Sequence, residues 1–304
     1  NKGTEDNRVR KLDYSIQISK LFYERFIKNE EISLFSPHDV PGLYDAFGTD
    51  SFDELYVRYE SDESVPRKSI GAQELFLDIL KERAETGRLY IMNIDHCNSH
   101  SSFLDKVEMS NLCQEITLPT KPLEHIDDPN GEIALCILSA VNVGKIRDLD
   151  DLKVLCDLAV RSLDELIDFQ NYPINAAEIA TKARRSLGIG FIGLAHYLAK
   201  NGHDYNDPEA WQLVHNLTEA FQYYLISATV DLAEEKGACE YSGRTKYGNG
   251  ILPIDTYKHD VDEIVPNELH YDWEDLRLRV KKHGVRNSTL SAQMPSESSS
   301  VVSN

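Results

Sequence analysis

The segment around Cys113 brings three chemically useful side-chain types together within five residues. It reads Asn111-Leu112-Cys113-Gln114-Glu115, with an amide two residues before the thiol and a carboxylate two residues after it. In an extended segment, residues at alternate positions point to the same side, so all three side chains are expected to face one substrate. An amide donates and accepts hydrogen bonds, a carboxylate serves as a base, and a thiol does nucleophilic or radical chemistry. The alternative is a buried structural cysteine with Asn111 and Glu115 in solvent, because free cysteine is commonly a small core residue.

A second cysteine, Cys136, lies in a nearly continuous apolar run from Glu132 to Ala140. Such a run is typical of a β-strand that is buried on both faces. Cysteine in a buried strand is ordinary packing. Cys136 therefore gains chemical interest only if it faces the same cavity as Cys113.

A third candidate lies near the end of the sequence, where Ser288–Met294 is predicted to form a strand. It runs into Pro295-Ser296-Glu297-Ser298-Ser299-Ser300. Proline is favoured at the first position of a helix, and serine and glutamate suit its first turn. A helix N-terminus presents free backbone N–H groups to an anion, and the serine hydroxyls add donors. The alternative is a plain capped helix or a loop without a ligand.

Two further clusters carry weaker signals. The stretch Asp95-His96-Cys97-Asn98-Ser99-His100 has metal-ligand residue types, but its spacing matches no standard zinc pattern, and a loop with a satisfied histidine is expected. The stretch Arg184-Arg185-Ser186-Leu187-Gly188-Ile189-Gly190 contains neither GxGxxG nor GKS or GKT. Helix packing through glycine is therefore expected there, rather than a phosphate loop.

The elements that must position these residues alternate between strands and helices. Leu12, Tyr14, Ile16 and Ile18 alternate with polar residues, which predicts a strand. Helices are predicted at 21–28, 73–85, 150–169 and 211–236, a further strand at 89–94, and 187–198 is ambiguous between the two. The predicted apolar stripe of the helix at 150–169 includes Leu152, Leu155, Leu158, Leu163 and Leu166. Alternating strands and helices indicate the α/β class, without choosing between an open sheet and a barrel.

Composition excludes several functional classes. The 304 residues carry a net charge of −19, which argues against nucleic acid as a partner but not against a small phosphorylated ligand. Five cysteines without a CxxC pair make a structural zinc site or a disulfide framework unexpected. The sequence shows neither a signal peptide nor an apolar run of membrane-spanning length, so the cytoplasm is the expected location. Since it also lacks an initiator methionine and a C-terminal tail, we expect it to be a piece of a longer protein.

Taken together, these segments resemble the large (α) subunit of class I ribonucleoside-diphosphate reductase along essentially the whole chain. The resemblance is to the bacterial and phage branch, and not to the cobalamin-dependent or glycyl-radical branches. The segments that carry it are Asn1-Lys2-Gly3-Thr4-Glu5-Asp6-Asn7-Arg8, Leu34-Phe35-Ser36-Pro37-His38, Ser110-Asn111-Leu112-Cys113-Gln114-Glu115-Ile116, Leu135-Cys136-Ile137-Leu138-Ser139, Arg286-Asn287-Ser288-Thr289-Leu290 and Met294-Pro295-Ser296-Glu297-Ser298-Ser299.

The resemblance implies a ten-stranded α/β barrel with a finger loop inside it. Cys113 would lie at the tip of this loop and form a transient thiyl radical that abstracts the 3′-hydrogen of a ribonucleoside diphosphate. Glu115 would take the 3′-OH proton, and Asn111 would hydrogen-bond the reacting sugar. Leu112 would belong to the same substrate-binding loop. A radical on such a loop is shielded from water by the barrel around it.

The resemblance also implies a redox residue and a phosphate site. Cys136 would be one half of the dithiol that reduces the sugar and closes into a disulfide, since a dithiol is a two-electron reductant. The substrate phosphates would be held by Pro295, Ser296, Glu297, Ser298 and Ser299.

Partners and missing parts follow from the same resemblance. The radical would come from a metal-containing small (β) subunit, thioredoxin or glutaredoxin would re-reduce the enzyme, and the large subunit would be a homodimer. No cofactor would bind in this chain, and the ATP and dNTP effectors of this allosteric family would bind regions outside it. Residues 1–304 would be part of a catalytic barrel domain, without the N-terminal ATP-binding domain, the first barrel strands and the C-terminal tail. Because the second redox cysteine would lie on one of those strands, the chain is expected to be inactive alone.

Two alternative functions would require other features in the sequence. Another radical enzyme of the same barrel class would need a glycyl-radical motif or a different arrangement of cysteines. A non-catalytic paralogue that binds or regulates a partner would be favoured by loss of Cys113, Glu115 or Cys136, and all three are present.

Overall fold

The computed structural model describes residues 12–266 and 268–303. These residues form two compact units. One comprises residues 12–101 and Lys106–Gln114, and the other comprises Ser102–Asp105 and residues 115–303. The stretch 1–8, which contributes to the family resemblance, lies outside the described residues.

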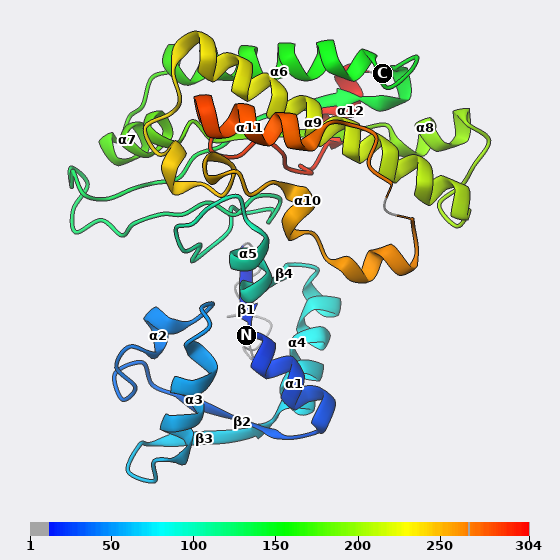
Figure 1. Ribbon diagram of the computed structural model, residues 1–304. Coiled ribbons are helices and arrows are strands. Elements are labelled where there is room, and N and C mark those ends of the chain that lie inside the picture. Colours follow the sequence, from blue (N-terminus) through cyan, green and yellow to red (C-terminus); the bar gives the residue numbers. More distant parts are fainter. Residues whose placement is uncertain (1–11, 267, 304) are drawn as a thin grey trace. The chain divides into compact units, whose positions relative to one another are not determined.

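The first unit combines short strands with short helices (Figure 1). Its elements in chain order are β1 (Tyr14–Ile18), α1 (Lys20–Lys28), β2 (Glu31–Phe35), α2 (Leu43–Ala46), α3 (Phe52–Ser61), β3 (Arg67–Gly71), α4 (Ala72–Thr86), β4 (Leu89–Asn93) and α5 (Ile94–His100). β1 pairs with β4 in parallel, and β2 pairs with β3 antiparallel. The predicted strand at 12–18 and the predicted helices at 21–28 and 73–85 are confirmed to within two residues.

Local sequence signals account for the ends of these elements. The hydroxyl of Ser19 accepts a hydrogen bond from the backbone N–H of Phe22, which caps α1. Gly87 ends α4 in the left-handed conformation with φ 66°, which glycine adopts at little cost. The loop predicted after β4 is wrong, because α5 begins at Ile94, whose side chain is completely buried.

The second unit contains the longest helices and a parallel strand pair (Figure 1). Its elements are β5 (Ile137–Asn142), η1 (Val143–Lys145), α6 (Asp151–Phe169), α7 (Asn175–Arg184), β6 (Leu187–Ile192), α8 (Leu194–Lys200), α9 (Pro208–Lys236), η2 (Ser242–Arg244), η3 (Tyr247–Asn249), α10 (Pro253–Thr256), η4 (His259–Glu263), α11 (Trp273–His283) and α12 (Glu297–Ser303). The predicted helices at 150–169 and 211–236 are confirmed as α6 and α9. Within the described part of the chain, no helix is long and apolar enough to cross a membrane.

β6 has backbone partners on both edges. β5 pairs with it in parallel along one edge. On the other edge, Leu187 donates its N–H to the carbonyl of Thr289 at 3.0 Å, and Ile189 donates to the carbonyl of Leu290 at 2.8 Å. The strand predicted at 288–294 is therefore only partly correct, since this stretch runs beside β6 with a single parallel bridge rather than a ladder.

The apolar run predicted to be one buried strand is divided in the structure. Its first residue, Glu132, pairs with Lys121 in an isolated antiparallel bridge. The strand begins only at Ile137, so Cys136 lies one residue before it. Leu138 is 43% exposed, so β5 is not buried on both faces. Burial on both faces instead describes β6, in which five of the six residues are buried.

The main core of the second unit lies between α6, α9 and β6. α9 and α6 pack along each other, and α9 ends at Gly237 as predicted. The predicted stripe of α6 is wrong at Leu155, Leu158 and Leu166, which are all more than a third exposed. The buried face consists of residues three or four apart, as a helix with one apolar side requires, namely Leu152, Cys156, Val160, Leu163 and Ile167.

A buried carboxylate on α6 binds two other segments of the second unit: the end of α7 and the residues just before the stretch beside β6. Asp164 is fully buried, and its Oδ1 accepts hydrogen bonds from Arg185 Nε at 2.7 Å and Asn287 Nδ2 at 3.0 Å. Its Oδ2 accepts from Arg286 Nε at 3.2 Å. Arg185 ends α7 just before β6, and Asn287 precedes the stretch beside β6. Asp164 therefore fixes where both segments begin.

The preceding arginine makes a second buried ion pair. Arg184 donates to Glu132 Oε2 at 2.8 Å and to Asp105 Oδ2 at 2.9 Å, and its side chain is 3% exposed. The two arginines are thus fully engaged with carboxylates. They position β6 rather than forming part of a phosphate loop.

Removing the Asp164 carboxylate should strongly destabilise the second unit. Asp164→Ala removes the only fully buried carboxylate of this cluster and leaves Arg185 with the half-exposed Asp168 as its one partner carboxylate among the described residues, so we expect a loss of about 3–5 kcal/mol in the free energy of unfolding. Both tryptophans, Trp211 and Trp273, lie in this unit, so urea unfolding followed by tryptophan fluorescence measures the effect. Asp157→Ala is the matched control: its ion pair with Arg161 is about a third exposed and should contribute less than about 1 kcal/mol. Equal effects of the two substitutions would contradict the central role of Asp164.

Candidate active site

Cys113 lies in a turn at the end of the first unit, not in an extended segment. The N–H of Gln114 donates to the carbonyl of Asn111 at 3.2 Å, and Gln114 adopts φ 60°. The expectation that Asn111, Cys113 and Glu115 share one side through strand alternation is therefore wrong, because it requires an extended backbone. The turn leaves Asn111, Leu112 and Cys113 exposed.

Hydrogen bonds within the first unit hold the segment that leads to this turn. Asn98 Oδ1 accepts from the N–H of Val107 at 2.7 Å, and Asn98 Nδ2 donates to the Val107 carbonyl at 3.0 Å. Gln17 donates to the carbonyl of Glu108 at 2.6 Å. Val107 is completely buried, so these bonds fix the backbone a few residues before Cys113. Sequence reasoning missed Asn98, whose only signal was its place among metal-ligand residue types.

The cluster at 95–100 forms α5 and makes structural contacts. The carboxylate of Asp95 accepts a hydrogen bond from the backbone N–H of Lys20 at the start of α1. The rings of His96 and His100 meet edge to face, with centroids 5.8 Å apart. Among residues 12–266 and 268–303, no three His, Cys, Asp or Glu side chains are grouped so that they could hold a metal ion.

Glu115 and Cys136 come together in the second unit, although 20 intervening residues separate them in sequence. Burial and, to a smaller extent, the nearby negative charge of Glu115 together raise the pKa of the Cys136 thiol to about 12. Glu115 Oε2 is buried and has no hydrogen-bond partner within the described residues. The arrangement thus combines a thiol that keeps its proton with a carboxylate oxygen that is available to accept one.

The glycines of the 187–190 stretch belong to β6, so the expectation of helix packing is wrong. Gly188 lies beside Cys136 and Leu138, and Gly190 lies beside Ala292. Sequence reasoning missed both as parts of the site, because it attributed the glycines to helix packing. The signal available was glycine at two alternate positions of an apolar strand, which marks a close approach of another backbone or side chain.

The helix predicted at Pro295 begins two residues later, at Glu297. The carbonyl of Ser296 accepts from the N–H of Ser300 at 2.8 Å, and the hydroxyl of Ser300 donates to the Glu297 carbonyl at 2.6 Å. Pro295, Glu297 and Ser298 are exposed, and the side chain of Ser299 lies outside the described part of the chain. Residues 295–299 follow closely after the residues that pair with β6. β6 therefore positions both this stretch and Cys136.

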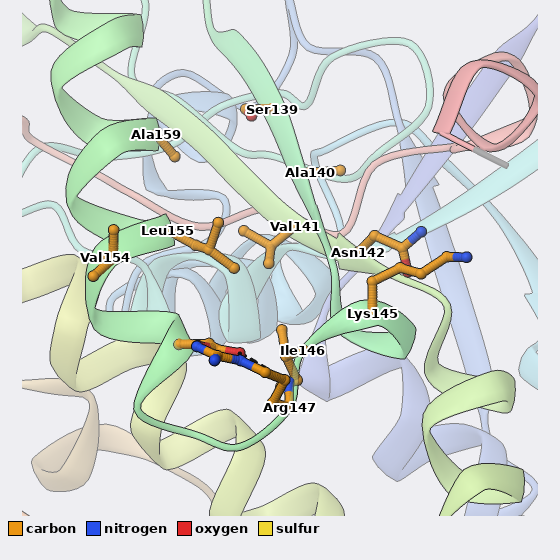
Figure 2. Close-up of a pocket in the computed structure, with 11 residues that line it drawn as sticks. Ser139, Ala140, Val141, Asn142, Lys145, Ile146, Arg147, Val154, Leu155 and Ala159 are labelled. Atoms are coloured by element: carbon orange, nitrogen blue, oxygen red, sulfur yellow. Dashed lines mark hydrogen bonds and ion pairs between the residues drawn. The ribbon is translucent and has the colours of Figure 1, made fainter.

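A cavity of about 680 Å³ opens between β5 and the start of α6 (Figure 2). Its polar rim includes Lys145, Arg147 and Asn142, and the Arg147 guanidinium is paired with Asp151 at 2.6 Å. Of the described residues that line it, none is a predicted site residue. Arg147 is already neutralised by its carboxylate, so we assign no chemistry to this cavity.

Comparison with known proteins decides the family. The model of the ribonucleotide reductase barrel domain matches residues 1–304, the whole chain. The chain belongs to the ribonucleotide reductase barrel-domain family. Family membership confirms the α/β barrel class. The strands of the described residues form three two-stranded sheets.

Related proteins with high sequence identity align with the entire chain. It is 58% identical over 309 residues to the ribonucleoside-diphosphate reductase subunit alpha of Haemophilus influenzae, and 57% identical to subunit alpha of reductase 1 of Escherichia coli. It is 44% identical over 312 residues to subunit alpha of Enterobacteria phage T4. Each comparison covers 100% of this chain and 41% of the relative, so the chain spans about two fifths of their length. The resemblance to bacterial and phage large subunits is confirmed.

Removing the charge of Glu115 should make Cys136 more reactive. The negative charge disfavours the thiolate, so Glu115→Gln should lower the pKa of Cys136 and speed its alkylation by iodoacetamide at pH 9. Peptide mass spectrometry measures the rate at this cysteine as a function of pH. Glu209→Gln, at an exposed position on α9, should leave the rate unchanged. A slower reaction in Glu115→Gln would show that the two side chains do not interact as described.

Proposed function

We propose that this chain is the catalytic barrel part of a ribonucleoside-diphosphate reductase large subunit. The reaction converts ribonucleoside diphosphates to 2′-deoxyribonucleoside diphosphates for DNA synthesis by a thiyl-radical mechanism. The observation that carries the proposal is the family match over all 304 residues, in a chain that retains Cys113, Glu115 and Cys136. In this proposal the 304 residues form part of one barrel domain with ten strands and an internal finger loop, and Cys113 lies on that loop.

The first step takes place at the finger loop. A thiyl radical at Cys113 abstracts the 3′-hydrogen of the sugar, which leaves a thiol and a carbon radical. Glu115 accepts the 3′-OH proton, which suits a buried carboxylate oxygen without another partner. Asn111 and Leu112 border the reacting sugar, and the amide of Asn111 hydrogen-bonds its hydroxyls. Asn111, Leu112 and Cys113 are exposed on this turn, which supports their contact with a substrate.

Cys136 supplies half of the reducing power. Two thiols become a disulfide, which provides the two electrons and two protons that turn the 2′-OH into water and leave C–H at C2′. A Cys136 thiol with a pKa of about 12 is fully protonated at neutral pH, so it enters this step as a hydrogen donor. Its disulfide partner would be a cysteine of the longer large subunit.

The substrate phosphates bind at Pro295, Ser296, Glu297, Ser298 and Ser299. Backbone N–H groups in the first turn of α12 have no intrahelical partner, so they can donate to phosphate oxygens. The stretch 288–292, which pairs with β6, positions this site relative to Cys136.

The proposal includes the partners of the complete enzyme. A metal-containing small subunit supplies the radical, thioredoxin or glutaredoxin reduces the disulfide, and the large subunit is a homodimer. The name subunit alpha of the relatives supports a partner subunit. ATP and dNTP effectors bind parts of the large subunit outside this chain, and the site of action is the cytoplasm.

Replacing the radical cysteine tests the reaction. In the complete large subunit, assayed with small subunit and reductant, Cys113→Ser should lower deoxynucleotide formation by at least about 10³-fold. Substrate binding, measured by equilibrium dialysis, should be retained, because the hydroxyl preserves the shape of the side chain. Cys97→Ser, on α5, is the control and should keep near-normal activity. Normal turnover by Cys113→Ser would rule out the radical role of this residue.

The 304-residue chain by itself should not turn over. The reaction needs a second redox thiol, and the chain spans only 41% of the length of its reductase relatives. The expected result is no dNDP above background when the isolated chain is supplied with a small subunit, NDP and dithiothreitol. Substantial product from the isolated chain would disprove the need for a second cysteine outside it.

A further inference from the structure

Gly188 and Gly190 occupy alternate positions of β6, so both present the same face of the strand. Neither has a positive φ. Their backbone conformation is therefore open to any residue, and the absence of a side chain needs another explanation. That explanation is what lies against this face.

A side chain at Gly188 would collide with the redox cysteine. A Cβ atom there would lie 2.7 Å from Cys136 Sγ, 2.6 Å from Leu138 Cδ2 and 3.2 Å from Ala292 Cβ. Non-bonded carbon atoms pack at about 3.5–4.0 Å. Even alanine would therefore displace the thiol or the leucine, because the methyl group of Ala292 closes the third side.

A side chain at Gly190 would collide with the backbone that leads to α12. Its Cβ would lie 2.3 Å from the carbonyl oxygen of Ala292, 2.6 Å from Gln293 Oε1 and 2.9 Å from Met294 Cε. The Ala292 carbonyl cannot rotate away as a side chain can. Gln293 is held in place because its Oε1 accepts a hydrogen bond from the N–H of Phe191 at 3.1 Å. The whole stretch 292–294 would have to shift.

We propose that Gly188 and Gly190 are positioning residues of the active site, with a different function for each. Gly188 lets the Cys136 thiol lie directly against β6, and Gly190 lets the Ala292–Met294 backbone do the same. One strand thereby sets the placement of the redox thiol and of the phosphate-binding stretch that begins at Pro295. The inference rests on the proposed function, because the two roles concern its substrate.

The two glycines should affect different kinetic constants of the complete reductase. Gly188→Ala should lower kcat about tenfold or more with KM within about twofold, because a small misplacement of a reacting group is costly while phosphate binding is intact. Gly190→Ala should raise KM for the ribonucleoside diphosphate about tenfold. Gly243→Ala is the matched control: this glycine is exposed, has no positive φ, and a Cβ there would meet nothing within 4 Å. It should change neither constant.

A second measurement follows the thiol without turnover. Gly188→Ala should change the rate of Cys136 alkylation at fixed pH, whereas Gly243→Ala should leave it unchanged. Leu138→Ala should partly restore kcat to Gly188→Ala, because it removes one of the two colliding side chains. Met294→Ala should not rescue Gly190→Ala, because the closest obstacle there is a backbone carbonyl. If Gly188→Ala folds poorly, the double variant with Leu138→Ala is measured in its place.

The outcomes separate this inference from the proposed function. A folded Gly188→Ala enzyme, or its double variant, with normal kcat and normal Cys136 alkylation would overturn the role of Gly188. A normal KM in Gly190→Ala, or rescue of its KM by Met294→Ala, would overturn the role of Gly190. If the unsubstituted enzyme makes no deoxynucleotide while Gly188→Ala still alters Cys136 alkylation, the proposed function fails and the steric role of Gly188 stands.

Discussion

Two consecutive buried arginines at the junction of α7 and β6 are the constraint on which the rest of the second unit depends. Removing a charge from water costs several kcal/mol unless it is paired, so Arg184 and Arg185 dictate where carboxylates must lie. Arg184 holds Glu132, four residues before Cys136. Arg185 and Asn287 both donate a hydrogen bond to Asp164, and Asn287 lies eight residues before Pro295. One ionic cluster therefore anchors both segments that carry site residues in this unit.

The site residues themselves lie outside regular elements, at points held by those elements. Cys136 precedes β5, Cys113 lies in a turn, and Pro295 precedes α12. Such positions leave backbone groups and side chains free for a ligand, while neighbouring packed segments limit their motion. In the first unit the side-chain amide of Asn98 holds the segment before Cys113, and in the second unit the buried ion pair of Arg185 with Asp164 helps to hold the segments around β6. Neither device involves a residue that would contact substrate.

Sequence patterns predicted most of the helices but less of the strands. α1, α4, α6 and α9 follow from apolar periodicity, together with the serine that caps α1 and the glycines that end α4 and α9, which are local signals. The strand predicted from Glu132 begins only at Ile137 as β5, and Glu132 is instead held by Arg184, 52 residues away in sequence, which no local pattern predicts. The stripe predicted for α6 treats every leucine as buried, whereas Leu158 is 55% exposed and Cys156 lies in the core.

The sequence motifs predict which residues belong to the candidate site, but they do not predict its geometry. The residue types around Cys113 and Cys136 and the chain-long resemblance identified the family, which the comparisons confirm. The turn at Gln114 is not predictable from the sequence, because a non-glycine residue adopts the left-handed φ there. The role of Gly188 and Gly190 depends on side chains and backbone from other segments that lie against β6, so the sequence alone does not predict it.

The high pKa of Cys136 has a consequence for the durability of the site in air. Peroxides attack the thiolate, and the rate of over-oxidation to sulfinic acid follows thiolate content and exposure. Because burial raises the pKa of Cys136 to about 12, its thiolate content at neutral pH is far below the few per cent of a free cysteine. The burial that keeps this thiol protonated thus also protects it from irreversible oxidation.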